Sequence, residues 1–234
     1  MSTARPTSWL VTGASRGIGF EIVRQLLSSP TNVVVAAART PEKATALKDL
    51  QKTAKGTLHV IKLDVSDFES IRASAKDLLA ILGDNGLDYL INNAAVVALP
   101  CLEKGMEKQI LHISSTGGSI GTAGHVGSRF GSYSMTKAAL NMLVRPYHLL
   151  SSVCVAVFLI AYITSSRQAY KQKLERPDFT VITLCPGWVK TDMGGEGAQL
   201  EPHESVAGIL KKITSATTAD SGKYLRYNGE TIPW

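Results

Sequence analysis

Short apolar runs alternate along the chain with segments whose apolar residues recur every three or four positions. The runs at residues 8–13 and 31–38 contain several β-branched residues and no charge, as strands buried in a parallel sheet do. Between these runs, residues 18–29 repeat their apolar positions with helical spacing. The order predicts a β-α-β unit at the start of the chain.

The alternation continues beyond this first unit. It predicts further strands at residues 57–65, 87–95, 108–115 and 179–187, and a helix at residues 68–82. No internal repeat, low-complexity tract or linker interrupts it. The pattern therefore predicts an α/β fold with a doubly wound parallel sheet of Rossmann type. A length of 234 residues suits a single domain over residues 1–234.

The composition is ordinary for a globular protein, with 44% hydrophobic and 19% charged residues. The net charge of +6 comes from 25 basic residues scattered among 19 acidic ones, without a nucleic-acid-binding motif, so nucleic acid is not expected as a partner. The three cysteines and five histidines lack the spacing of metal ligands, and no metal site is expected. The first residues lack the apolar core of a secretion signal, and we expect a cytoplasmic protein.

A glycine-rich turn, "TGASRGIG", joins the first strand to the first helix and contains Gly13, Gly17 and Gly19. Glycines at this place let the backbone turn sharply and approach a pyrophosphate, while the helix N-terminus offers free amide groups. Such turns also occur for steric reasons alone. The position after the first strand favours phosphate binding.

The end of the second strand carries an arginine where a dinucleotide fold contacts the adenosine ribose. An acidic side chain there accepts a hydrogen bond from a free 2′-hydroxyl, whereas an arginine pairs with a 2′-phosphate. Arg39 occupies this place, and Arg16 in the glycine turn is placed to approach the same phosphate. If these are not solvated loop arginines, they favour NADP(H) over NAD(H) as the cofactor.

"YSMTK" places Tyr133 and Lys137 one helical turn apart on the same helix face. A phenol titrates near pH ~10, so it needs a nearby cation to work as an acid at neutral pH. Lys137 would supply that cation. Such pairs are common on helix surfaces, and it is the motifs around this pair that favour a catalytic role for it.

Six motifs follow one another over nearly the whole chain, namely "TGASRGIG", "LDVSD", "NNAA", "HISS", "YSMTK" and "PGWVKTDMGG". In this order they resemble the short-chain dehydrogenase/reductase family. "SSTGGSIG" and the closing "YNGETIPW" are most similar to its carbonyl-reductase branch with the sniffer-type enzymes. The resemblance implies an oxidoreductase that transfers a hydride from NADPH to a small ketone or aldehyde.

The resemblance also assigns roles to residues. Tyr133 would protonate the substrate carbonyl oxygen, Ser115 rather than the adjacent Ser114 would donate a hydrogen bond to it, and Lys137 would lower the pKa of the phenol and bind the nicotinamide ribose. The cofactor-binding residues would be Gly13, Ser15, Arg16, Gly17, Ile18, Gly19, Arg39, Asp64, Val65, Asn92, Ala94, Tyr133, Lys137, Pro186, Gly187, Val189 and Thr191.

The chain departs from the family between the fourth and fifth strands. Asn93 and Ser115 are 22 positions apart, roughly half the separation that the family has. The family's crossover helix there carries an asparagine of the proton relay and forms much of the subunit interface. Residues 96–109 can return along a sheet at about 3.3 Å per residue, but a full helix with two turns will not fit. We expect this helix to be shortened or absent, one sheet face to be underpacked, and homo-oligomerisation to stay open.

The second departure is the uncharged segment 149–163, "LLSSVCVAVFLIAYI". Removing residues 145–166 restores the family's spacing between Lys137 and Pro186. Our first hypothesis is a splicing or gene-model product, and the second is a native insertion over the underpacked face. A membrane anchor ranks third, because a helix of this length spans about 22 Å of a hydrocarbon core of about 30 Å.

Two other functions compete with the reductase. "GGSIG" at residues 117–121 matches the G-x-S-x-G of α/β-hydrolases around Ser119, and Asp192 and His203 follow in hydrolase order, but the glycine-rich sequence after the serine argues against the helix that a nucleophile elbow needs. The runner-up is a catalytically impaired relative or splice variant that binds nucleotide or a protein partner without turnover. The missing helix motivates this alternative.

Overall fold

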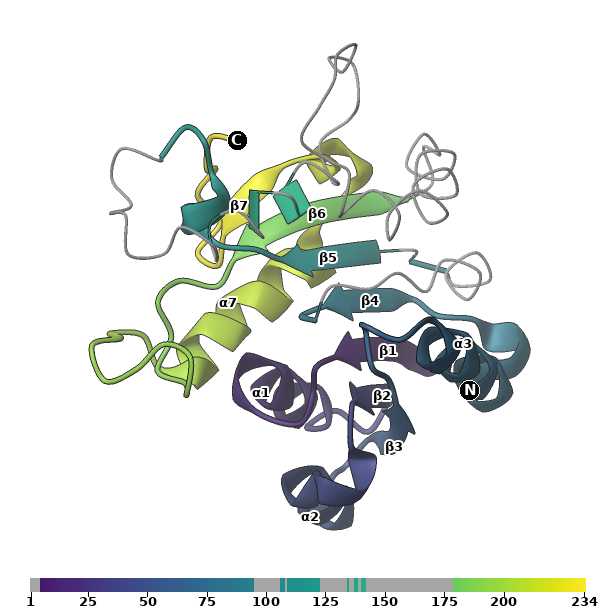
Figure 1. Ribbon diagram of the computed structural model, residues 1–234. Coiled ribbons are helices and arrows are strands. Elements are labelled where there is room, and N and C mark those ends of the chain that lie inside the picture. The colour runs from purple at the N-terminus through teal and green to yellow at the C-terminus, as the bar shows by residue number, and fades with distance from the viewer. Residues whose placement is uncertain are drawn as a thin grey trace.

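A seven-stranded parallel sheet forms the centre of the molecule (Figure 1). The computed structural model describes residues 5–94, 106–107, 109–122, 134, 137–138, 140–141 and 179–234. The strand order is β3-β2-β1-β4-β5-β6-β7, and every neighbouring pair is parallel. The strands are β1 (Thr7–Thr12), β2 (Asn32–Ala38), β3 (Thr57–Lys62), β4 (Tyr89–Asn92), β5 (Gln109–Ile113), β6 (Thr180–Cys185) and β7 (Tyr224–Arg226).

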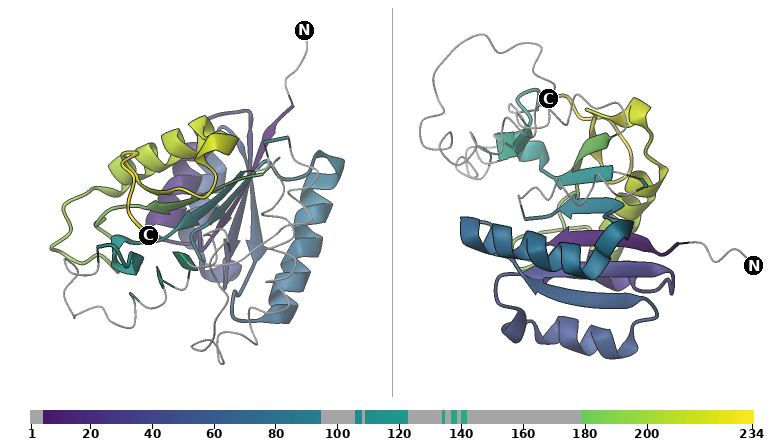
Figure 2. Two further views of the ribbon diagram at one scale, coloured as in Figure 1. Left: turned by 90° about the horizontal axis from the view of Figure 1, so that it is seen from above. Right: turned by 90° about the vertical axis from the view of Figure 1, so that its right-hand side faces the viewer.

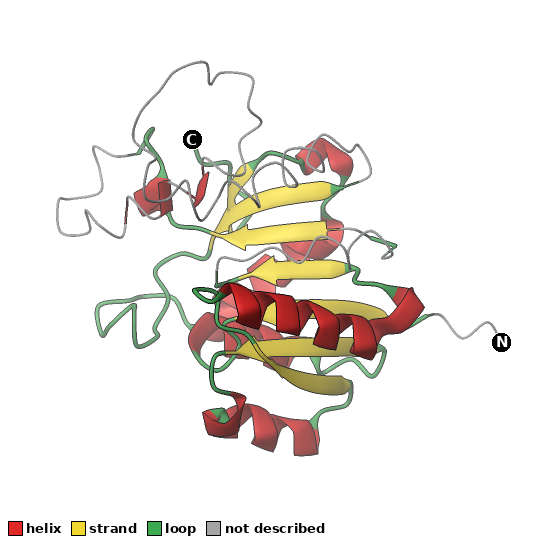
Figure 3. Ribbon diagram, turned by 45° about the vertical axis from the view of Figure 1, so that its right-hand side comes forward, coloured by secondary structure: helices red, strands yellow, loops and turns green. Residues whose placement is uncertain are grey.

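Helices cover both faces of this sheet. Figure 2 shows α7 and α3 on opposite sides of the strands, and Figure 3 shows the strands between helices. The α-helices are α1 (Gly17–Leu26), α2 (Thr45–Thr53), α3 (Phe68–Leu82) and α7 (Pro202–Ser215). Short 3₁₀ turns are η1 (Pro41–Lys43), η2 (Gly83–Asn85), η3 (Thr116–Gly118) and η6 (Thr218–Asp220). The predicted doubly wound parallel sheet is confirmed.

The alternation of side chains along each strand divides the core into two layers. In β4, Ile91 packs into the cluster that contains residues of α1, α2 and α7, whereas Leu90 packs into the cluster that contains residues of α3. In β1, Val11 and Leu10 are divided in the same way. The strands β1 and β4 are therefore buried on both faces, which explains why they read as largely apolar runs in the sequence.

The sequence pattern located most of the described elements. The helix predicted at residues 68–82 has those bounds, and six strands lie within the predicted runs or begin one residue outside them. The pattern did not point to α2, α7 or the three-residue β7. The predicted shortened crossover helix and the insertion at residues 145–166 lie outside the described residues. Within the described part of the chain, no helix is both long and apolar enough to span a membrane.

Candidate active site

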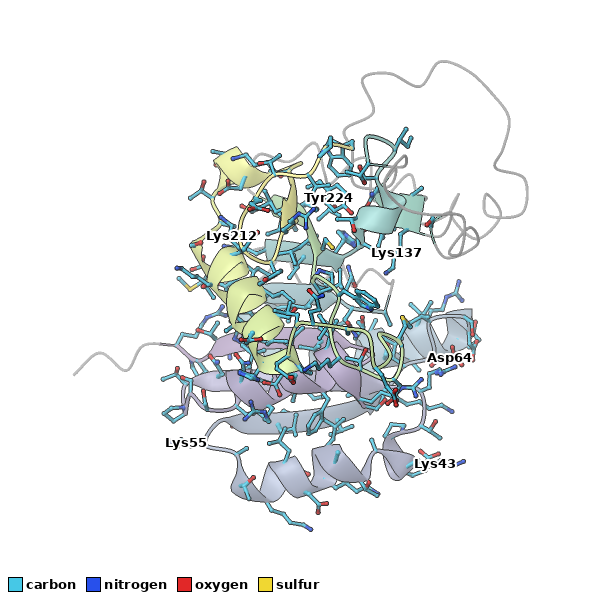
Figure 4. The ribbon with its side chains drawn as sticks, turned by 90° about the vertical axis from the view of Figure 1, so that its left-hand side faces the viewer. Lys43, Lys55, Asp64, Lys137, Lys212 and Tyr224 are labelled. Carbon is cyan, nitrogen blue, oxygen red and sulfur yellow. The ribbon has the colours of Figure 1, made fainter. Side chains whose placement is uncertain are left out.

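A cleft of about 530 Å³ opens at the carboxyl ends of the parallel strands. It brings together the glycine turn after β1 and the segments that follow β2, β3, β4, β5 and β6. The side chains of Asp64, after β3, and Lys137 lie at this end of the sheet, opposite Lys55 (Figure 4). Of the residues predicted from the sequence, those lining the cleft are Gly13, Ser15, Arg16, Gly17, Ile18, Arg39, Asp64, Val65, Ala94, Lys137, Pro186 and Thr191.

The glycine turn has the backbone conformation that its sequence predicts. Gly13 and Gly17 have φ angles of 65° and 58°, a region that costs glycine little and other residues more. A Cβ atom built on Gly19 would lie 2.4 Å from the carbonyl oxygen of Gly13. Asn93 fixes the turn, because its side-chain amide donates to the carbonyl oxygens of Thr12 at 3.1 Å and Gly13 at 3.2 Å.

The N-terminus of α1 meets the cleft without a side-chain cap. Arg16 is the N-cap residue, its side chain makes no capping hydrogen bond, and the first turn contains no acidic residue. The first amide groups and the positive end of the helix dipole are thus available to an anion. Together with the close backbone approach at Gly13 and Gly17, this arrangement fits the pyrophosphate of a dinucleotide.

Two arginines and two carboxylates lie along the cleft, on the segments after β1, β2, β3 and β6. Asp64 accepts hydrogen bonds from the hydroxyl of Ser66 at 2.7 Å and its amide at 3.0 Å, and these bonds lower the pKa of the Asp64 carboxyl, with Arg39 adding to the effect. Arg16 pairs with Asp192 at 3.2 Å. Both side chains of that pair are largely exposed, so it is weak and open to competition by another anion.

Lys137 lies among residues that are all helical where described, from Ser134 to Asn141. Its Nζ donates to the carbonyl oxygen of Ile113 at 3.0 Å, and burial lowers the pKa of the ammonium group. Gly118 allows the close approach of this segment, since a Cβ built there would lie 2.6 Å from the carbonyl carbon of Lys137. Tyr133, the predicted partner of Lys137, lies outside the described residues.

The two serines after β5 differ in how their hydroxyl groups are used. Ser114 is buried and donates to Oδ1 of Asn141 at 2.6 Å, while Asn141 donates to the carbonyl oxygen of Gly118 at 2.9 Å. Ser115 is half-buried and caps η3, where its Oγ accepts from the amide of Gly117 at 3.2 Å. Because the proton of Ser114 is committed to Asn141, Ser115 is better suited to donate to a substrate.

Some predicted residues lie beside the cleft without lining it, namely Gly19, Asn92, Ser115, Gly187 and Val189. Asn92 is buried, with its amide nitrogen 3.5 Å from Nδ1 of His112, and the next residue, Asn93, lines the cleft. The lining residues that the sequence analysis did not select as sites are Ala38, Leu63, Ser66, Asn93, Ile113, Ser114, Asp192 and Met193. Most of them adjoin a predicted residue, so adjacency in the sequence is the signal that could have found them.

The residues of the hydrolase alternative have separate surroundings. Ser119 is buried, and its hydroxyl donates to the carbonyl oxygen of Pro233. Asp192 pairs with Arg16, and the main-chain carbonyl of His203 accepts from Gln25 at 3.0 Å. These contacts join each residue to a different neighbour and give no support to a hydrolase triad.

Comparison with known proteins decides the family. A family model described as short chain dehydrogenase matches residues 8–109. The crystal structure of an NADPH-bound carbonyl reductase from chicken fatty liver is 30% identical in sequence, covers 98% of this chain and 100% of its own, and superposes with a TM-score of 0.77. The chain belongs to the short-chain dehydrogenase family.

Other relatives agree with this assignment. An uncharacterised oxidoreductase of Schizosaccharomyces pombe is 25% identical to this short-chain dehydrogenase over 272 residues, which cover 97% of each chain. The carbonyl reductase Sniffer of Drosophila melanogaster, 24% identical, covers 98% of this chain and 100% of its own with a TM-score of 0.76, and shows the same fold. The protein is thus an oxidoreductase of short-chain dehydrogenase type with carbonyl reductases among its structural neighbours.

Proposed function

We propose that this short-chain dehydrogenase reduces a small ketone or aldehyde to an alcohol with NADPH. The observation that carries the proposal is the cleft itself, which joins an uncapped helix N-terminus, two arginines and a half-buried lysine along one edge of the sheet. A dinucleotide phosphate and a reacting carbonyl group need these three kinds of group in one place. The NADPH bound to the chicken carbonyl reductase supports the same cofactor here.

The residues of the chain would divide the work of binding. Amide groups of the turn from Gly13 to Gly17 and the N-terminus of α1 would hold the pyrophosphate. Arg16 and Arg39 would pair with the 2′-phosphate, so Arg16 would exchange Asp192 for this anion. The cofactor supplies the hydride when bound. We also propose that the whole chain forms one domain around this cleft.

Proton transfer would fall to the predicted triad. Tyr133 would donate its phenolic proton to the substrate carbonyl oxygen, and the hydroxyl of Ser115 would donate a hydrogen bond to the same oxygen. Lys137 would favour the phenolate that remains. Its partial burial strengthens this effect, because less water screens a charge there than at the surface.

The test is NADPH oxidation measured with a panel of carbonyl compounds, together with NADPH binding followed by fluorescence. We expect saturable binding and carbonyl-dependent oxidation, and we expect Tyr133→Phe to abolish oxidation while binding persists, because the variant lacks only the transferred proton. Saturable NADPH binding without oxidation of any carbonyl compound would instead support the catalytically impaired relative.

A further inference from the structure

Tyr224 is a fully buried tyrosine that the proposed chemistry does not use. It lies in β7, pairs in register with Thr183 of β6, and has a relative exposure of 0%. Figure 4 shows it in the same upper part of the molecule as Lys137. A buried phenol retains a polar group that needs a partner, so the contact of its hydroxyl reveals what the residue does.

The hydroxyl of Tyr224 donates to the main-chain carbonyl oxygen of Ser115. The two residues are 109 positions apart, so this bond links β7 to the turn that follows β5. The same carbonyl oxygen accepts from the amide of Gly118 at 2.8 Å, which closes the first turn of η3. The phenol therefore acts on the peptide plane that sets the direction of the Ser115 side chain.

Packing fixes the ring of Tyr224 and hence its hydroxyl. The ring lies in a buried cluster with Cys185 and Ile232, and its centroid is 5.3 Å from that of Trp234 at an interplanar angle of 37°. Cys185 supports the same turn from β6, since its Sγ accepts from the amide of Thr116 at 3.4 Å. The turn that carries Ser115 is thus held by the last two strands of the sheet.

We propose that Tyr224 is a positioning residue for Ser115. By donating to the Ser115 carbonyl oxygen, its phenol holds the turn from which the Ser115 hydroxyl would reach a substrate oxygen at the edge of the cleft. This inference rests on the proposed function for its catalytic consequence. The geometric part, that Tyr224 holds the Ser115 turn, can be measured without substrate or cofactor.

The test compares Tyr224→Phe with a matched control, Tyr89→Phe. Tyr89 is also a buried tyrosine, but it lies at the amino end of β4, where its ring stacks on Trp9 at 3.9 Å. We expect Tyr224→Phe to lower kcat about tenfold and to leave the Kd of NADPH within twofold of wild type, because the substitution removes the hydroxyl that donates to Ser115 and keeps the packed ring. Tyr89→Phe should leave both values unchanged.

A double variant separates positioning from general damage. In a Ser115→Ala background the hydroxyl that Tyr224 positions is absent, so adding Tyr224→Phe should lower kcat no further. Amide hydrogen exchange in the cofactor-free protein provides a second readout. We expect Tyr224→Phe to speed exchange in residues 114–119 at least threefold, and Tyr89→Phe to leave it unchanged.

The outcomes separate the two proposals. Exchange in residues 114–119 that is unaffected by Tyr224→Phe overturns the inference even if the enzyme is active. The inference is also overturned if adding Tyr224→Phe to Ser115→Ala lowers kcat by the same tenfold factor as it does in wild type. Equal losses of kcat from Tyr224→Phe and Tyr89→Phe overturn it as well. A wild-type protein that binds NADPH but oxidises it with no carbonyl compound overturns the proposed function, and the exchange result then decides whether Tyr224 holds the turn.

Discussion

Arg39 is the residue on which the choice of cofactor depends most directly. It lines the cleft at the end of β2, where the adenosine ribose is expected, and it contributes to the lowered pKa of Asp64. A guanidinium group at this place pairs with a 2′-phosphate and gains nothing from a 2′-hydroxyl. The preference for NADPH should therefore respond to this side chain alone.

We expect Arg39→Asp to weaken NADPH binding at least tenfold and to bring the Kd of NADH below that of NADPH. The new carboxylate would repel the 2′-phosphate and accept a hydrogen bond from the 2′-hydroxyl of NADH. Fluorescence titration with both cofactors measures the effect. Lys43→Asp makes a comparable charge reversal at an exposed residue outside the cleft lining and serves as control; equal losses in the two variants would contradict the assignment.

At the scale of single residues, the sequence located the right loops but not always the right neighbour. The motif predicts Asn92 as a cofactor-binding residue, yet it is Asn93 that lines the cleft. Asn92 is the last residue of β4 and is buried against β5. The strand ends one residue before the chain turns into the cleft, and strand ends are the least certain part of a sequence prediction. The sequence suggests Asp192 only as a member of a hydrolase triad. Its pairing with Arg16 could not be predicted, because the two residues are 176 positions apart.

At the scale of elements, η3 approaches the helical segment carrying Lys137 very closely. A Cβ atom on Gly118 would lie 2.6 Å from the carbonyl carbon and 2.7 Å from the Cβ of Lys137. Backbone atoms on both sides leave no flexible group that could move aside. Any side chain at residue 118 must displace one of the two segments.

We expect Gly118→Ala to lower kcat at least tenfold, because Lys137 would move relative to Ile113 and Ser115, and to lower the Tm by several degrees. Steady-state kinetics and thermal unfolding measure the two effects. Gly83→Ala is the control, since Gly83 has a φ of 54° but no atom within 4 Å of an added Cβ. It should reduce the Tm through backbone strain alone and keep kcat. A Gly118→Ala enzyme with wild-type kcat would refute the role of this contact.

Local signals explain why some helices were predicted better than others. The helix α3 is bounded by Asp67, whose side chain accepts from the amide of Glu69 at 3.0 Å, and by Gly83. The helix α7 begins with Pro202 after Glu201, whose amide donates to Glu204 at 3.1 Å. Glutamate is an uncommon N-cap residue, so this start carries a weaker signal than Asp67 does. The strand β7 is three residues long and gives no period to detect.

At the scale of the whole molecule, His112 links stability to pH. It is buried in β5, and burial lowers its pKa from 6.5 to about 4. Below pH 6.5 the imidazole of His112 binds a proton in the unfolded chain, whereas in the folded chain it stays neutral down to about pH 4. The unfolded state therefore binds more protons in this window, and stability is fully present above pH 6.5 and falls as the pH drops toward 4.

We expect wild type to lose about 2 kcal/mol of unfolding free energy between pH 6.5 and pH 5 through this residue, since each pKa unit corresponds to about 1.4 kcal/mol. His112→Gln should show a correspondingly smaller loss, because glutamine does not titrate. Urea unfolding of both proteins at the two pH values measures the difference. Parallel pH dependences of the two proteins would contradict the burial of a neutral imidazole.

The overall architecture followed from the sequence because most of the described strands are buried, largely apolar runs, and such runs alternate with helices in only a few folds. The chain runs from β1 outward through β2 to β3 on one side of the sheet and then returns to β4 on the other side of β1. The cleft lies at this switch point, which is where open α/β sheets bind ligands. The position of the site could thus be predicted from topology. The contacts of Ser115 with Tyr224 could not, because no local pattern relates residues so far apart.

The contacts of Arg16 with Asp192 and of Ser115 with Tyr224 join residues far apart in the sequence, and this affects the order in which they form during synthesis. On the ribosome, the dinucleotide-binding turn emerges long before Asp192 and β7, and contacts of high sequence separation form late and slowly. An incompletely synthesised chain contains Arg16, Arg39 and the glycine turn. It lacks the part of the cleft that follows β6, including Asp192, and the contact of Tyr224 with Ser115. In nascent chains of this oxidoreductase, the contact between Tyr224 and Ser115 can therefore form only after β7 has been synthesised.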